Sequence, residues 1–426
     1  MVRLEEHKNR TENEAIEKMP AASRVYIPLS QHLGKVCNPL VKTGDQVFLG
    51  QKIASVEAHV YSPIHASVSG KVIAIQDWPH PVLGRCKAIV IENDGLDSRQ
   101  SSVFSRQSEE INKLTAEQIR NIVFEAGIVG MGGASFPTHI KLNPPKPVDA
   151  LIVNCAECEP YLTSDYRLMV EKTKEIMLGI DIVARCLGVK KVSIAIEDNK
   201  PAAIKAFNNE LRTADYELKV LKSQYPQGGE KQLIKNVLRR EVPSGKLPFD
   251  VGVVVHNVGT VFAIYEALYL NKPLYERVVT VTGSCVSNPK NLLVRIGTPV
   301  KELIDAFGPL KEEPEKIIIG GPMMGIAQYT DEVPVIKSTT GVVLLNKREA
   351  KIQEEEFCIR CGACVRNCPA GLMPCLINLA SEKELWTEAK AYNAIDCIEC
   401  GLCNYVCPAN RTLVQSIKRA KLEVAR

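Results

Sequence analysis

The feature that most constrains this chain is a cysteine motif that occurs twice near the C-terminus, each time as C-x-x-C-x-x-C-x-x-x-C-P. Four thiolates at this spacing can surround an iron–sulfur cube, and in two-cluster ferredoxins the fourth cysteine of each run ligates the other cluster. We therefore predict two [4Fe–4S] clusters with crossed ligands. The first ligand set is Cys358, Cys361, Cys364 and Cys407, and the second is Cys397, Cys400, Cys403 and Cys368.

A pair of zinc ribbons is the alternative for so many cysteines. Zinc ribbons normally use two C-x-x-C pairs for each metal, whereas each run here is a triplet followed by a separate Cys-Pro. The spacing therefore favours iron–sulfur clusters and the transfer of single electrons.

Composition excludes several other classes of protein. The remaining seven of the fifteen cysteines are scattered rather than arranged as a disulfide framework, which is typical of a reducing compartment. The net charge is only +4 and both signs are mixed along the chain, so nothing predicts binding to nucleic acid. The charged N-terminal stretch lacks the apolar region of a signal peptide.

One apolar stretch, residues 251–270, is close to the length that a membrane span needs. It contains His256, Asn257 and Glu266, and its pattern indicates a buried strand that leads into a helix. We expect no transmembrane helix, so any membrane attachment should come from a partner.

Residues 1–110 are predicted to form a small all-β domain with a linker. Short apolar runs between Val25 and Asp94 are separated by turns that contain glycine, and residues 100–108 are polar and rich in serine. The pattern resembles the biotinyl/lipoyl-type barrel-sandwich hybrid domain. No acceptor lysine occurs at the hairpin tip, residues 57–60, so we predict a scaffold or docking module.

Residues 111–275 alternate strands and helices, which favours an α/β domain with a mainly parallel sheet. Ligands bind such sheets at the carboxyl ends of the strands, where the strand order reverses. The predicted strands are 150–154, 192–196, 218–221 and 251–255, and the predicted helices are about 164–187, 201–211, 230–239 and 258–270.

The last two predicted domains complete a multidomain α+β fold. Residues 276–350 contain four short strands and one helix, residues 300–307, which fits a β-grasp-like domain of the SLBB type. Residues 351–426 form the double-[4Fe–4S] ferredoxin domain, with a C-terminal amphipathic helix that we expect to pack onto the rest of the chain.

A glycine-rich loop, residues 127–141, ends in a lysine but matches neither a Walker A loop nor a dinucleotide fingerprint. Glycines allow the backbone to approach a phosphate or a ring, and the lysine supplies an opposite charge. Loops 154–160, 225–230 and 256–260 add amides, carboxylates and a hydroxyl, which are the groups that a flavin needs. Cys155 and Cys158 could form a redox pair or bind a metal, but no second cysteine pair accompanies them.

These loops and both cysteine runs closely resemble the C subunit of the Rnf complex, a membrane-associated ferredoxin:NAD oxidoreductase, over nearly the whole chain. The α/β part is also similar to the flavoprotein subunit of respiratory complex I, which binds FMN and NADH. The motifs that carry the resemblance are GIVGMGGASFPTHIKL, NCAECEPYLTSDYRLM, YPQGGEKQLI, HNVGT, CIRCGACVRNCPAGLMP and CIECGLCNYVCPANRTLVQ.

The resemblance implies a set of site residues. Phe136, Glu159 and Glu230 would lie where NADH docks over the flavin and would take part in catalysis. Ala156 replaces an aspartate of the flavoprotein from complex I, Cys155 replaces a glycine that is usual in Rnf relatives, and the family's N-terminal glycine-histidine-proline segment is absent. The residues expected to hold FMN are Gly130, Gly132, Gly133, Lys141, Asn154, Glu157, Asn257 and Thr260.

The resemblance also implies a function. The chain would be a peripheral subunit of an ion-translocating complex at the cytoplasmic face of the cell membrane, in contact with other Rnf-type subunits and, indirectly, with ferredoxin. It would exchange hydride between NADH and FMN and relay single electrons through both clusters, because a flavin joins two-electron and one-electron chemistry. The alternatives are a soluble electron-transfer flavoprotein that feeds a reductase such as proline reductase, and a flavin-free iron–sulfur wire.

Overall fold

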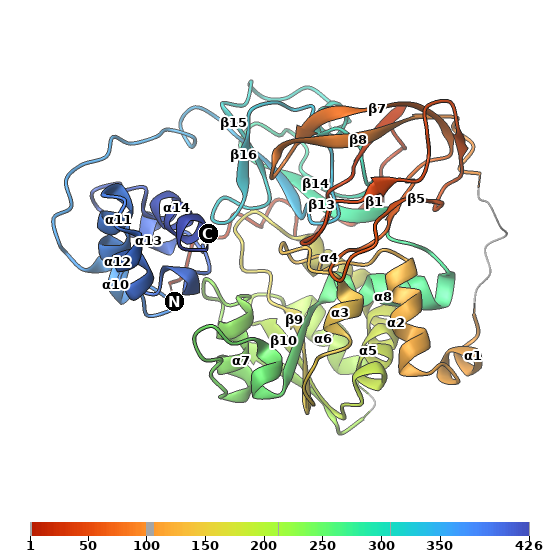
Figure 1. The fold of residues 1–426 in the computed structure, drawn as a ribbon, viewed down its shortest axis with the longest axis horizontal. Helices are drawn as coiled ribbons and strands as arrows, with labels where there is room; N and C mark the ends of the chain where they lie inside the picture. The colour runs from red at the N-terminus through yellow and green to blue at the C-terminus, as the bar shows by residue number, and fades with distance from the viewer. Residues whose placement is uncertain (1, 99–105, 212, 307, 426) are drawn as a thin grey trace.

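The computed structural model describes residues 2–98, 106–211, 213–306 and 308–425. Two β-rich parts lie above an α/β part in Figure 1, and the cysteine-rich helices form a lobe at one end. The predicted multidomain α+β fold with a parallel sheet is confirmed.

The N-terminal β part consists of two sheets around a small apolar core. Val25, Ile53 and Ile89 are fully buried between the sheets. The predicted linker lies mostly outside the described residues. One sheet has the order β2 (Arg24–Pro28), β8 (Gly84–Asn93), β7 (Gly70–His80), β4 (Gln46–Val47), and the other β3 (Asn38–Pro39), β5 (Lys52–Ser55), β6 (Ile64–His65).

The α/β part contains a parallel sheet of four strands in the order β11, β10, β9, β12. Because β10 and β11 lie on one side of β9 and β12 on the other, the strand order reverses between β9 and β12. The predicted switch point is therefore present. The strands are β9 (Ala150–Cys155), β10 (Lys191–Glu197), β11 (Tyr216–Leu221) and β12 (Val253–Asn257).

Helices cover both faces of this sheet because alternate strand residues point to opposite sides. Leu151 and Val153 face a core with α2, α5, α6 and α8, whereas Ile152 and Val255 face α7. The helices of this part are α1 (Ser108–Asn112), α2 (Ala116–Glu125), α3 (Thr138–Lys141), α4 (Ser164–Glu171), α5 (Thr173–Leu187), α6 (Pro201–Glu210), α7 (Glu230–Leu238) and α8 (Val258–Leu270).

Two predicted elements of the α/β part need correction. The single helix 164–187 is two helices, because Lys172 adopts a non-helical backbone (φ −128°, ψ 28°) between α4 and α5. The strand predicted at 251–255 starts later, because a 3₁₀ turn, η1 (Pro248–Val251), ends at Gly252 with φ +77°.

The β-grasp-like part is a mixed sheet of six strands with the order β1, β14, β13, β17, β15, β16. The four predicted strands and the helix α9 (Val300–Asp305) are present. Sequence analysis missed β16 (Ile326–Gln328) and β1, both only three residues long and without clear alternation. The strands are β1 (Ile16–Lys18), β13 (Glu276–Thr282), β14 (Lys290–Arg295), β15 (Lys316–Ile319), β16 and β17 (Gly341–Leu345).

The C-terminal lobe is helical, with the cysteine runs between short helices. Leu413, Ile417 and Ala420 of its last helix are buried in the core of the lobe, which confirms that this helix packs onto the chain. No helix of the described residues is long and apolar enough to cross a membrane. The helices are α10 (Ala363–Arg366), α11 (Pro374–Glu382), α12 (Trp386–Ala391), α13 (Leu402–Tyr405) and α14 (Leu413–Val424), with a 3₁₀ turn, η2 (Ala394–Asp396).

Candidate functional site

Four loops meet near the carboxyl ends of β9 and β12, and hydrogen bonds join them. We call this region the four-loop site; its loops are residues 127–141, 154–160, 225–230 and 256–260. The Met131 amide of the glycine-rich loop donates to Thr260 Oγ1 at 2.9 Å, and Asn154 Nδ2 donates to the Gly228 carbonyl at 2.9 Å. Asn257 Oδ1 caps α8 by accepting from Thr260 N at 3.3 Å. The structure thus brings Asn154, Asn257 and Thr260 together with two glycine loops.

The glycine-rich loop forms a tight turn with an open outer side. The Gly130 amide donates to the Phe136 carbonyl at 2.8 Å, so Phe136 is placed at the base of this turn. A Cβ on Gly132 would lie 3.2 Å from the Asn257 side chain, whereas Gly133 has φ +116° and nothing within 4 Å of its Cβ position. Glycine relieves close packing at the first position and a left-handed backbone at the second, and the exposed backbone fits the close approach of a phosphate or flavin ring.

Lys141 and Glu230, expected to bind phosphate and NADH, pair with each other. Lys141 Nζ lies 2.5 Å from Glu230 Oε1, and the two side chains are 31% and 40% exposed. Lys141 ends α3 and Glu230 begins α7, so the pair joins two of the four loops. An ion pair this exposed adds little stability, and an anionic ligand can compete for the lysine.

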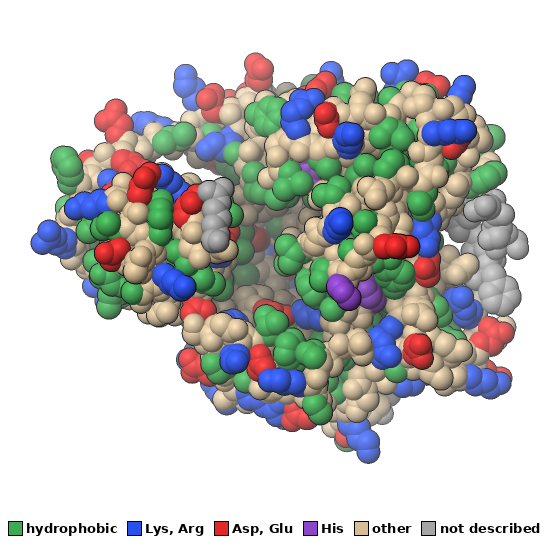
Figure 2. Space-filling view, viewed as in Figure 1, with side chains coloured by type: hydrophobic (Ala, Val, Ile, Leu, Met, Phe, Trp, Pro, Cys, Tyr) green, Lys and Arg blue, Asp and Glu red, His purple; other side chains and the backbone are tan. Residues whose placement is uncertain are grey.

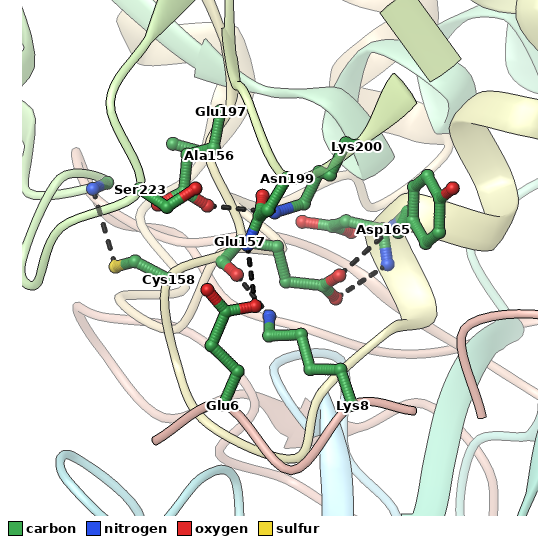
Figure 3. A network of polar contacts seen from close by, with 12 residues as sticks. Glu6, Lys8, Ala156, Glu157, Cys158, Asp165, Glu197, Asn199, Lys200 and Ser223 are labelled. Atoms are coloured by element: carbon green, nitrogen blue, oxygen red, sulfur yellow. Dashed lines mark hydrogen bonds and ion pairs between the residues drawn. The ribbon is translucent and has the colours of Figure 1, made fainter. Parts of the chain in front are cut away.

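The Glu157 carboxylate points to the start of α4 rather than outward. It accepts hydrogen bonds from the amides of Asp165 at 2.8 Å and Tyr166 at 3.2 Å, as Figure 3 shows. A carboxylate at a helix N-terminus satisfies unpaired amides and complements the helix dipole. The Glu157 side chain therefore supports the start of α4 behind the loop.

A buried charge network lies behind this loop, and sequence analysis missed it (Figure 3). Lys200 Nζ lies 2.8 Å from Glu197 Oε2, both side chains are 2% exposed, and Lys8 Nζ donates to the Glu157 carbonyl. Burial, followed by the charge of Lys200, lowers the pKa of Lys8. Burial alone would lower the pKa of Lys200, but Glu197 and Glu157 raise it overall. Single charges far apart in sequence carry no motif that could have identified them.

Asp165 is a second residue that sequence analysis missed. Its Oδ2 accepts from Asn257 Nδ2 at 2.7 Å, so it orients the amide that caps α8. Burial, followed by repulsion from Glu157, raises the pKa of Asp165 to about 6. Its position in the sequence, in the first turn of a helix, indicated only an ordinary helix start.

Glu159 is turned away from the glycine-rich loop. Its carboxylate accepts from the backbone amides of Met323 at 3.2 Å and Met324 at 2.8 Å, in the loop between β15 and β16. Burial raises its pKa to about 7, although these hydrogen bonds act in the opposite direction. All three residues expected at the NADH position lie on the four loops, but the Glu159 carboxylate is held by the β15–β16 loop rather than directed at the glycine-rich loop.

The second cysteine set lines one cavity in the C-terminal lobe. Cys368 from the first run faces the same space as Cys397, Cys400 and Cys403, together with apolar residues such as Leu402. This donor set fits a [4Fe–4S] cluster with crossed ligands. Within the described residues, however, no three cysteine, histidine or carboxylate side chains converge at metal-binding geometry. In the first set, Cys358 and Cys361 are exposed, whereas Cys364 and Cys407 are half-buried.

Cys155 and Cys158 are free thiols in this structure. Burial raises both pKa values, that of Cys158 to about 12, and Cys158 Sγ accepts from the Gly228 amide at 3.4 Å. A thiol with a raised pKa is a poor nucleophile or metal ligand, which favours a packing role.

Comparison with known proteins places these parts in a family. The RnfC barrel sandwich hybrid domain matches residues 2–96, the Nuo51 FMN-binding domain residues 123–266, the SLBB domain residues 278–327, and the 4Fe-4S dicluster domain residues 357–411. The C subunit of the proton-translocating ferredoxin:NAD(+) oxidoreductase complex of Clostridium ljungdahlii is 48% identical over 425 residues, which are 99% of this chain and 93% of that protein. The chain belongs to the family of C subunits of these complexes.

Further matches agree with this family. The C subunit of the Na(+)-translocating complex of Acetobacterium woodii is also 48% identical, over 94% of this chain and 90% of that protein. An NAD+-reducing [NiFe]-hydrogenase structure, in the air-oxidized state, shares the fold with a TM-score of 0.50 and 17% identity, covering 75% of this chain and 69% of that chain. The predicted family is confirmed, and the matched domain models confirm the predicted cofactor classes, a flavin and iron–sulfur clusters.

Proposed function

We propose that this chain is the NADH-oxidising and electron-relaying subunit of an ion-translocating ferredoxin:NAD oxidoreductase complex. The observation that carries the proposal is the convergence of four hydrogen-bonded loops at the switch point, in a chain that also contains two cysteine sets. When bound, FMN would exchange a hydride with NADH and release the electrons singly, as iron–sulfur clusters require.

The chain's own residues provide the flavin site that we propose. The backbone of Gly130, Gly132 and Gly133 would lie against the cofactor, since a Cβ at Gly133 would meet nothing within 4 Å. Lys141 would balance the phosphate charge, and Asn154, Asn257 and Thr260 would supply polar contacts, while Glu157 supports the loop through α4. Phe136 and Glu230, at the rim, would contact NADH. Glu159 would act at a distance, by positioning the β15–β16 loop.

The assembly that we propose follows from the family. Its members are named as subunits of a complex, so other subunits of an Rnf-type complex are the expected partners. We propose attachment through those partners at the cytoplasmic face of the membrane. As working domain limits we propose 1–110, 111–275, 276–350 and 351–426.

One anaerobic measurement tests this function. The purified chain, reconstituted with iron, sulfide and FMN, should contain about eight iron atoms, as two [4Fe–4S] clusters require. NADH should bleach the flavin absorbance near roughly 450 nm, because hydride transfer reduces the ring. Eight irons without any bound flavin would support the iron–sulfur wire instead.

Cell fractionation tests the soluble alternative. A component of a membrane complex should sediment with membranes and be released by conditions that break protein contacts. Recovery only in the soluble fraction, together with a soluble reductase, would contradict the membrane assignment.

A further inference from the structure

The loop of residues 225–230 connects the four-loop site to the cysteine-rich lobe. On one side, its Gly228 carbonyl accepts from Asn154. On the other side, the hydroxyl of Tyr225 donates to the backbone carbonyl of Cys400 at 2.7 Å. Tyr225 is 2% exposed, so this hydrogen bond is shielded from water and fixes the position of Cys400.

Further contacts bind the second cysteine set to the α/β part. Gln232 Nε2 of α7 donates to the carbonyl of Pro369, the neighbour of Cys368, at 3.3 Å. Asp396, the neighbour of Cys397, accepts from the Gly245 amide at 3.4 Å and from the Ser244 hydroxyl. For three of the four predicted ligands, the cysteine itself or its neighbour in sequence is thus hydrogen-bonded to the α/β part.

Apolar packing supports the same junction. Tyr225, Cys400, Leu402 and Leu4 form one small buried core, which joins the N-terminal segment, the α/β part and the lobe. A Cβ on Gly401 would lie 2.7 Å from the Met323 carbonyl, so the β15–β16 loop also approaches this turn closely.

The first cysteine set is more exposed than the second. Cys358 and Cys361 are exposed, and their neighbours Phe357 and Ile359 are 95% and 65% exposed. One polar contact of this run comes from its own lobe, where Arg366 Nη1 donates to the Cys361 carbonyl at 2.9 Å. Figure 2 shows the lobe standing off from the main body with a hollow between them, so the junction is confined to part of the lobe.

We propose that the two cysteine sets have fixed places in the electron path, with Tyr225 as the positioning residue. The cluster that the inner set (Cys368, Cys397, Cys400 and Cys403) would hold would exchange electrons with a flavin at the four-loop site. The cluster that the outer set (Cys358, Cys361, Cys364 and Cys407) would hold would exchange them with a partner subunit. This order rests on the proposed function.

The electron balance of this order is simple. Oxidation of one NADH yields NAD+, one proton and two electrons, and the electrons pass singly through the inner and then the outer set. A one-electron acceptor on the partner subunit is reduced twice for each NADH, and the reverse order holds when the partner supplies electrons.

Two cysteine variants of the full chain, reconstituted anaerobically with iron, sulfide and FMN, test the order. Cys403→Ala removes a ligand of the inner set, and Cys361→Ala removes a ligand of the outer set. In each variant, the electron paramagnetic resonance (EPR) signal that remains after dithionite reduction belongs to the cluster of the intact set. With NADH, Cys361→Ala should keep the inner signal. Cys403→Ala should lose the NADH-induced outer signal although dithionite still produces it. The reverse pattern would overturn the order.

A variant that retains all eight predicted cysteine ligands controls for misfolding of the cysteine variants. Tyr225→Phe removes the hydroxyl that donates to the Cys400 carbonyl and that also contacts the Glu159 carboxylate, and it changes no cysteine. The EPR signal of the dithionite-reduced inner set should therefore shift while the outer signal stays unchanged. The control is Tyr392→Phe, at a tyrosine of the same lobe that is 37% exposed, and neither signal should move. A shift of the outer signal in Tyr225→Phe, or of neither, would overturn the role of Tyr225.

Failure of the proposed function is distinguishable from failure of the order. If the wild-type chain binds FMN but NADH reduces neither flavin nor cluster, the function fails. The Tyr225→Phe comparison uses dithionite and still decides which set is attached to the four-loop site.

Discussion

Glu230 forms an ion pair at the position that we propose for NADH. It begins α7 and pairs with Lys141, the cation that we assign to the FMN phosphate. A carboxylate that contacts NADH must leave this pair when the lysine turns to the phosphate. The ion pair is partly exposed, so this exchange should cost little.

Glu230→Gln should therefore separate NADH oxidation from cofactor content. Loss of a charged hydrogen bond to the nucleotide should lower kcat/KM for NADH by roughly tenfold or more. FMN affinity should not fall, because Lys141 loses a competing carboxylate. Steady-state kinetics with an artificial electron acceptor measures the first effect and flavin titration the second.

The matched control is Glu241→Gln, which removes an exposed carboxylate paired with Lys235 of the same helix. It should leave the kinetics unchanged. Equal losses in both variants, or a fall in iron content with Glu230→Gln, would remove the assignment of Glu230 to NADH.

Lys337 is a buried residue with a titration that can be tested. Its Nζ donates to the carbonyls of Pro63 at 2.7 Å and Gly127 at 2.6 Å, so it joins the N-terminal β part to the start of the glycine-rich loop. Burial lowers its pKa to about 7, only partly opposed by Cys37. The neutral amine has two N–H groups, which match the two carbonyls.

The pH dependence follows from this lowered pKa. Between about pH 7 and pH 10.4 the unfolded chain binds more protons at this residue than the folded chain does, so its contribution to stability rises with pH. Below pH 7 the contribution is constant and least favourable, because both states are protonated. His32 and His65, whose pKa values burial lowers to about 4 and about 3, are neutral throughout this range.

Lys337→Met should remove this dependence. The variant should lose about 1–3 kcal/mol at high pH, because two buried carbonyls lose their donor. Between pH 7 and pH 10 the urea midpoint of the wild type should rise relative to that of the variant. Parallel midpoints across this range would show that Lys337 keeps an ordinary pKa.

At the scale of elements, helix α4 depends on a residue outside itself. Its N-cap, Thr163, makes no side-chain capping bond, and Glu157 from the preceding loop accepts from the first amides instead. The loop that carries the proposed flavin-site residues and the helix that follows therefore stabilise each other.

Glu157→Ala should destabilise the chain by about 1–2 kcal/mol, the usual effect of losing a cap. Flavin affinity should fall as well, because the 154–160 loop loses its attachment. Thermal unfolding and flavin titration measure the two effects. Glu117→Ala, at an exposed carboxylate in the first turn of α2, should change neither, and an equal effect in both variants would contradict the role of Glu157.

The sequence predicts elements and sites where the signal is local. The cysteine spacing and the strand pattern of the parallel sheet both lie within short windows, and the sheet is present. The break at Lys172 could not be predicted, because the residues on both sides continue a helical pattern. The roles of Glu157 and Glu159 depend on where their side chains turn, which only the folded neighbours determine.

At the scale of the whole molecule, the N-terminal segment connects parts that are distant in sequence. Val2 pairs with Tyr225, Lys8 reaches Glu157, and β1 joins the sheet of the β-grasp-like part beside β14. No sequence pattern indicated these contacts, because each lies more than a hundred residues from its partner.

Deletion of residues 2–18, which includes β1, should loosen this junction without unfolding the N-terminal β part, whose core begins after β1. Hydrogen exchange should become faster at Tyr225 and in β14, because their backbone partners are lost. Exchange in β7 and β8, which pair with each other, is the internal control. Unchanged protection at Tyr225 would show that the segment does not hold the junction.

The attachment of β1 to β14 has a consequence for biogenesis. The ribosome produces β1 some 270 residues before its partner strand, since Ile16 pairs with Asn291. The segment that contains β1 therefore remains without its partner strand while the N-terminal β part and the α/β part are synthesised. Its docking is thus a late step in maturation, and a chain arrested before residue 290 would lack the partner strand that β1 needs.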